Sequence, residues 1–157
     1  LLSTTDYAEF FANKWSSILR NKRKADTYTR GTQAFHEWIR QSFHINKPYN
    51  QFVSELVTAR GEISHNPATA WFRNVTDQKE RLQDTAQVLL GVRLQCAECH
   101  HHPYEKWSQQ DYYGFSAFFS RIGKKKTDMP GEEAVFHNVG LATANIQRLD
   151  KTLNQHL

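Results

Sequence analysis

The N-terminal part of the chain carries the pattern that decides the predicted fold class. Residues 6–22 read DYAEFFANKWSSILRNK. Their large apolar side chains recur three or four positions apart, which is the period of an α-helix with one buried face. Asp6 and Glu9 have the spacing of a capping box at the start of such a helix. This stretch therefore predicts an amphipathic helix.

The same period continues along most of the chain. It predicts helices over residues 32–46, from Pro48 to near Gly61, from Asp77 towards Cys96 and from Ser108 to Ile122, with a short helical turn at 69–74. Residues 127–140 lack a helical period and include a stretch that reads as extended, Ala134–His137. A last helix is predicted for residues 143–156.

We therefore expect an all-α fold of about five to six helices. Residues 1–126 are predicted to form one helical domain. Residues 127–157 are predicted to add a loop and a C-terminal helix that packs on the same domain.

Composition narrows the class of protein. The chain has 157 residues, the usual size of one domain, and 39% of them are hydrophobic, with aromatic residues making up 13%. The net charge of +4 is too small to indicate nucleic-acid binding by itself. No apolar run reaches the roughly 18 to 20 residues that a membrane span needs. The two cysteines are too few for a disulfide-stabilised scaffold.

These two cysteines form the most specific motif in the sequence. Cys96 and Cys99 precede His100 as Cys-x-x-Cys-His, the attachment sequence of c-type haem. On one helical turn both thiols would face the same side and form thioethers with the two haem vinyl groups. The imidazole of His100 would then lie under the iron as an axial ligand. The motif predicts one covalent haem c, around which the helices pack.

Three other interpretations of the cysteines stay open. A structural zinc site would use Cys96 and Cys99 with two histidines, such as His102 and His137, and would make the protein an interaction module. A thioredoxin-like redox pair is disfavoured because it needs a βαβ context that the sequence lacks. Two inert thiols would leave the adjacent histidine unexplained.

Several stretches resemble the planctomycete cytochrome-type domains, a family named for its haem motif and otherwise of unknown function. The likeness covers roughly residues 7–123, and it is carried by residues 47–56 (KPYNQFVSEL), 86–96 (AQVLLGVRLQC), 99–107 (CHHHPYEKW) and 111–115 (DYYGF). The resemblance implies an exported, helical, haem-bearing module, often part of a longer chain. It implies no substrate.

The sixth ligand of the expected iron is open at this stage. Met129 is the only methionine and lies in a polar segment that precedes Pro130, so we predict that it is the sixth ligand. His137 and His65 are the alternatives. An unligated or water-bound iron is a further alternative.

The predicted function is therefore that of a mono-haem c-type cytochrome domain that passes single electrons. A non-enzymatic electron carrier or a redox-complex subunit is favoured, and whether the protein is an enzyme stays open at this stage. A haem domain with an open site for ligand binding or redox catalysis is the alternative. Because haem c is attached outside the cytoplasm, we expect a periplasmic or other extracytoplasmic location. The expected partner is a redox protein or a membrane redox complex, with an acidic surface that meets basic clusters at Arg20–Lys24 and Lys124–Lys126.

Overall fold

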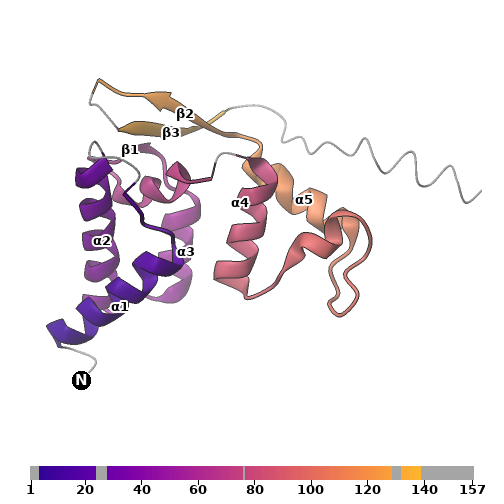
Figure 1. Ribbon diagram of the computed structural model, residues 1–157, viewed down its shortest axis with the longest axis horizontal. Coiled ribbons are helices and arrows are strands. Elements are labelled where there is room, and N and C mark those ends of the chain that lie inside the picture. Colours follow the sequence, from indigo (N-terminus) through magenta and orange to yellow (C-terminus); the bar gives the residue numbers. More distant parts are fainter. Residues whose placement is uncertain (1–3, 24–27, 76, 129–131, 139–157) are drawn as a thin grey trace, which may run out of the picture. The chain divides into compact units, whose positions relative to one another are not determined.

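The computed structural model describes residues 4–23, 28–75, 77–128 and 132–138 (Figure 1). The chain divides into two compact units. The first comprises residues 1–76 and 123–137, and the second comprises residues 77–122 and 138–157. The predicted C-terminal helix at 143–156 lies outside the described residues, so that helix and the predicted boundary at residue 126 stay predictions.

The first unit contains helices α1 (Thr5–Ile18), α2 (Thr29–His44) and α3 (Tyr49–Val57) and the 3-10 helix η2 (Pro67–Arg73). All four were predicted from the helical period. The predicted capping box of α1 is wrong. Thr4 is the N-cap, and its Oγ1 accepts a hydrogen bond from the backbone N–H of Tyr7 at 3.3 Å.

Aromatic rings form much of the core of the first unit. The ring of Trp38 stacks on Phe35 at a centroid distance of 5.8 Å and on Phe52 at 4.9 Å. Phe35 and Leu56 are fully buried. Rings of this size each bury a large apolar area, which compensates for the small hydrophobic fraction of the sequence.

The all-α prediction is wrong, because the first unit also holds a three-stranded antiparallel sheet. Its strands are β1 (Gly61–Glu62), β2 (Ile122–Lys126) and β3 (Glu133–His137), in the order β1-β3-β2 (Figure 1). Gly61 pairs with Val135, and Glu62 pairs with Ala134. The extended stretch predicted at Ala134–His137 is confirmed as β3.

The sheet escaped prediction because two of its strands have no pattern of their own. β1 is two residues long, and β2 consists of one isoleucine, one glycine and three lysines. Neither shows the apolar alternation that identifies a half-buried strand. Their backbone groups are paired by β3, which is far from β1 in the sequence, and such long-range pairing leaves no local signal.

The second unit contains helix α4 (Gln78–Thr85), the π-helical turn η3 (Ala86–Leu90), the 3-10 helix η4 (Leu94–Glu98) and helix α5 (Gln109–Phe119). Asp77 caps α4, as predicted, and Ser108 and Asp111 form the predicted capping box of α5. The predicted continuous helix from Asp77 to Cys96 is interrupted at Gly91, whose φ of 71° ends η3 in the left-handed region.

The core of the second unit lies where α4, η4 and α5 meet. Its buried side chains come from all three elements and from η3: Leu82, Ala86, Leu94, Ala97, Tyr112, Tyr113 and Phe119. Two of them, Leu94 and Ala97, belong to the segment that carries the cysteines. No helix in the described parts of the chain is long and apolar enough to cross a membrane, as the sequence predicted.

Candidate functional site

The predicted attachment motif lies on a tight helical turn. Cys96 is in the 3-10 helix η4, and Cys99 is its C-cap, with φ −107° and ψ −28°. Side chains three positions apart eclipse one another in a 3-10 helix, so the two thiols lie on one face. Both cysteines are free and exposed. The segment is thus a 3-10 turn rather than the α-helical turn expected from the sequence.

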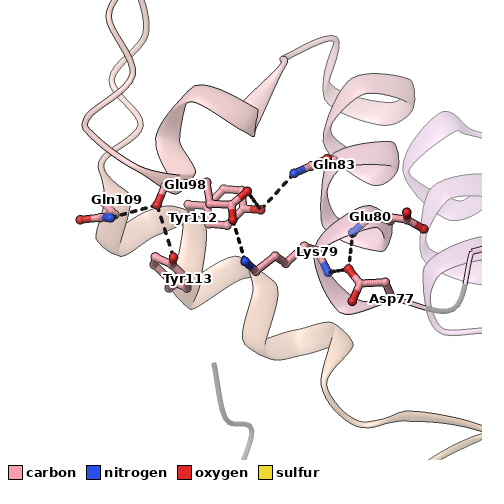
Figure 2. Close-up of polar contacts among 8 residues, drawn as sticks. All are labelled: Asp77, Lys79, Glu80, Gln83, Glu98, Gln109, Tyr112 and Tyr113. Carbon is pink, nitrogen blue, oxygen red and sulfur yellow. Dashed lines mark hydrogen bonds and ion pairs between the residues drawn. The ribbon is translucent and has the colours of Figure 1, made fainter. Parts of the chain in front are cut away.

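The two residues between the cysteines face the protein. Ala97 is fully buried in the core of the second unit. The backbone carbonyl of Glu98 accepts hydrogen bonds from Nε2 of Gln109 at 2.9 Å and from the hydroxyl of Tyr113 at 3.3 Å (Figure 2). The inner face of the turn is thus anchored to α5, while the thiols stay outside.

The carboxylate of Glu98 adds a second anchor (Figure 2). Its Oε1 accepts a hydrogen bond from Nζ of Lys79 on α4 at 2.6 Å, and its Oε2 accepts one from the hydroxyl of Tyr112 at 3.4 Å. That hydroxyl in turn accepts a hydrogen bond from Nε2 of Gln83 at 3.1 Å. One residue of the motif therefore connects the turn to both long helices of the unit.

These contacts shift two pKa values. The hydrogen bond to Glu98 raises the pKa of Lys79 above its ordinary value, and the slight burial of the amine opposes this. Burial raises the pKa of Tyr112, because the phenolate would lose its hydration in the core. Around neutral pH the network therefore pairs a charged amine with a carboxylate beside a neutral phenol.

His100 has one ring nitrogen occupied and one available. Its Nδ1 lies 2.6 Å from the backbone carbonyl oxygen of His101. A carbonyl can only accept, so Nδ1 carries the hydrogen and donates it. The neutral ring then has its lone pair on Nε2. Metal-ligating histidines commonly use this arrangement, in which a backbone carbonyl fixes the tautomer and the other nitrogen binds the metal.

His102 has both ring nitrogens occupied. Its Nδ1 lies 3.0 Å from the backbone N–H of Glu105 and 3.3 Å from that of Tyr104, so Nδ1 accepts. Its Nε2 lies 3.1 Å from the carbonyl oxygen of Arg93, so Nε2 donates. Its backbone N–H donates to the carbonyl of Trp107 at 2.8 Å. The side chain is therefore engaged in holding the loop and has no free lone pair for a metal ion.

Comparison with known protein families identifies the family to which this chain belongs. The model of PSCyt2, described as a protein of unknown function (DUF1549), matches residues 1–124. The chain belongs to the PSCyt2 family. The resemblance to a planctomycete-associated family is thereby confirmed, and the family itself carries no assigned function. No curated protein and no solved structure matches the chain.

The PSCyt2 match includes the predicted attachment motif and His65, whereas Met129 and His137 follow the matched residues. Met129 lies outside the described residues. His65 and His137 belong to the first unit, whereas the motif belongs to the second. His65 is exposed, with Nδ1 at 3.1 Å from Oγ of Ser64, and Nε2 of His137 lies 3.4 Å from the carbonyl of Ala59. The sixth position stays a prediction.

The zinc alternative gains no support within this PSCyt2 chain. Among residues 4–23, 28–75, 77–128 and 132–138, no three or more His, Cys, Asp or Glu side chains form a group that could hold a metal ion. The chemistry of the motif fits haem c better, because two exposed thiols share one face and His100 presents a free Nε2.

Sequence reasoning missed the residues that support the motif. Glu98 is one of the two unspecified positions of Cys-x-x-Cys-His, and its partners are 11 to 19 positions away in the sequence. Tyr112 and Tyr113 had no expected role beyond their place in the predicted helix from Ser108 to Ile122. His102, a possible zinc ligand in the sequence analysis above, holds the loop instead.

Proposed function

We propose that this chain is a mono-haem c-type domain that carries single electrons. The observation that supports the proposal most directly is the presentation of the motif. Cys96 and Cys99 expose free thiols on one side of a 3-10 turn whose intervening residues are fixed to the protein core. Such a rigid base with an outward reactive face suits covalent attachment of a flat ligand.

Each motif residue has a distinct role in this proposal. Cys96 and Cys99 would hold the haem through two thioethers, and His100 would bind the iron through Nε2. The bound haem supplies the one-electron ferric/ferrous couple. The protein fixes the orientation of the imidazole through the Nδ1 hydrogen bond to His101, which also makes Nε2 a better donor to a metal.

The proposal also concerns location and partner. Attachment of haem c outside the cytoplasm would place the protein in the periplasm or at another extracytoplasmic surface. A carrier needs a donor and an acceptor, and we propose a redox protein or membrane redox complex with an acidic docking surface. Lys125 and Lys126 are exposed and available to such a surface.

The test is direct. The chain, co-expressed with a haem c attachment system, should show a mass about one haem above that of the polypeptide, and the haem should survive acid-acetone extraction. The pyridine haemochrome spectrum should be that of a haem with two thioethers. Cys96→Ser and Cys99→Ser should each leave one thioether. A colourless protein with free thiols and bound zinc would overturn the proposal.

A further inference from the structure

The strongest unassigned feature is the set of hydrogen bonds around His102. Four polar groups of the loop converge on this one residue: the carbonyls of Arg93 and Trp107 and the backbone N–H groups of Tyr104 and Glu105. His102 uses both ring nitrogens and its backbone N–H to bind different parts of one loop. It lies two positions after His100.

The bond between His102 and Arg93 closes the segment that contains the motif. Arg93 is the N-cap of η4, and its carbonyl accepts from Nε2 of His102 at 3.1 Å. Cys96, Cys99 and His100 all lie between these two residues. Closing a loop restricts the conformations of everything inside it, so the bond limits where the two thiols and the imidazole can move.

The other three contacts fix the far side of the same loop. The backbone N–H groups of Tyr104 and Glu105 both donate hydrogen bonds to Nδ1 of His102. The backbone N–H of His102 donates to the carbonyl of Trp107. Trp107 stacks on Phe115 with the rings tilted by 17°, and both pack against the core of the second unit. His102 therefore connects a polar loop segment to Trp107, which packs against the core of the second unit.

We propose that His102 is a positioning residue that holds the Cys96–His100 turn ready for double thioether formation. This inference rests on the proposed function. In each attachment a thiol adds across a vinyl group: sulfur bonds to the inner carbon and the thiol hydrogen goes to the outer carbon, so nothing leaves. Both additions need the two thiols to face one porphyrin at the same time, and the closed loop supplies this alignment in advance.

The main experiment compares two variants with the unaltered chain, all expressed with the attachment system. His102→Ala should leave most of the protein with a single thioether, seen as a shifted pyridine haemochrome band and one alkylatable thiol. His101→Ala is the matched control, because the His101 side chain is an exposed neighbour of the same type that makes no hydrogen bond in the described structure. It should carry two thioethers, as the unaltered chain does.

A conservative variant separates positioning from simple loss of folding. The amide oxygen of asparagine in His102→Asn takes the place of Nδ1 and can accept from Tyr104 and Glu105, but the side chain is too short to reach Arg93. We expect it to fold and to recover part of the doubly attached fraction. If His102→Ala does not fold, the comparison rests on His102→Asn and His102→Gln, each of which should lower the doubly attached fraction at least twofold.

A haem-independent readout tests the geometry itself. In the apoprotein, the long-range nitrogen–proton spectrum of His102 should show the hydrogen on Nε2, and the amide of Glu105 should lose protection from exchange in His102→Ala. Full double attachment in both His102→Ala and His102→Asn would overturn the inference while leaving the haem proposal intact. Absence of haem from the unaltered chain would instead overturn the proposed function.

Discussion

Nζ of Lys79 lies 2.6 Å from Oε1 of Glu98, and this pair connects helix α4 to the middle of the Cys-x-x-Cys-His turn. Glu98 is three-quarters buried at its side chain, and the same residue contributes its carbonyl to Tyr113 and Gln109. The position between the cysteines is therefore a structural junction. It explains how a short turn can keep two thiols exposed and still be held in place.

Breaking this pair should cost stability in a measurable way. We expect Glu98→Gln to lower the free energy of unfolding by about 1 kcal/mol, because Lys79 loses its charged partner while the hydrogen bond from Tyr112 is weakened. In a double-mutant cycle with Lys79→Met, the coupling energy should be about 0.5 kcal/mol, since half of the lysine side chain is exposed. Urea unfolding followed by circular dichroism measures it. If the two changes in the free energy of unfolding were strictly additive, the pair would contribute nothing to stability.

The protein should lose stability at alkaline pH. Burial raises the pKa of Tyr112, so above about pH 10 the unfolded chain releases a proton that the folded chain keeps. The raised pKa of Lys79, caused by its hydrogen bond to Glu98, acts in the same direction: its contribution is complete below about pH 10.4 and is lost as pH rises through the folded value. Unfolding midpoints in urea between pH 8 and 11 should fall.

Tyr112→Phe should make that fall shallower, because the phenol no longer ionises on unfolding. The control is Tyr104→Phe, which removes a hydroxyl from a side chain that is 92% exposed. An equal slope in the two variants would contradict the assignment to Tyr112.

The sheet should be sensitive to a methyl group at Gly123. A Cβ built there would lie 2.5 Å from Cζ of Phe136, so the ring covers the glycine closely. We expect Gly123→Ala to destabilise the protein by about 1 kcal/mol, at the low end for overpacking, because Phe136 is 40% exposed and can shift. In Phe136→Ala the same change should be nearly neutral. Equal costs in both backgrounds would show that the ring is not the cause.

The basic cluster at residues 124–126 divides into two kinds of lysine. Lys124 is only 15% exposed; its Nζ donates to the carbonyl of Arg73 at 3.1 Å and lies 3.6 Å from Oε2 of Glu133. Lys125 and Lys126 are exposed. We expect Lys124→Gln to lower the melting temperature. The paired change Lys125→Gln with Lys126→Gln should leave the melting temperature unchanged.

If an acidic redox partner docks on these exposed lysines, the paired variant should slow electron transfer. It should also weaken the dependence of the rate on salt, because exposed charges are screened over about 8 Å at physiological ionic strength. An electron-transfer rate that depends neither on salt nor on the paired change would contradict docking at this site. Lys124→Gln does not test it, since that side chain is engaged within the fold.

The sixth ligand can be tested by spectroscopy. We expect Met129 to bind the iron, in which case the oxidised protein has the weak far-red sulfur-to-iron band. Met129→Ala should remove the band, lower the reduction potential and allow carbon monoxide to bind. A low-spin spectrum without the band would favour His137 and then His65. A high-spin spectrum in the unaltered protein would indicate an open site and a role in ligand binding.

The sequence alone predicted most of the described helices. Helical period and capping residues act within a few positions, so α2, the Asp77 cap and the Ser108–Asp111 box could all be predicted. The role of Cys96, Cys99 and His100 in haem attachment was inferred from their spacing alone and stays a prediction. Family membership followed from these local stretches as well.

Tertiary structure alone decided strands β1 and β2 and the support of the motif. Strand β2 (Ile122–Lys126) forms because β3 pairs with it. Its sequence has no apolar alternation from which a strand could be predicted. Glu98 and His102 acquire their roles from partners on α4, on α5 and across the loop. Hydrogen bonds between distant residues depend on how the chain folds back on itself, and a sequence pattern records only what neighbours along the chain impose.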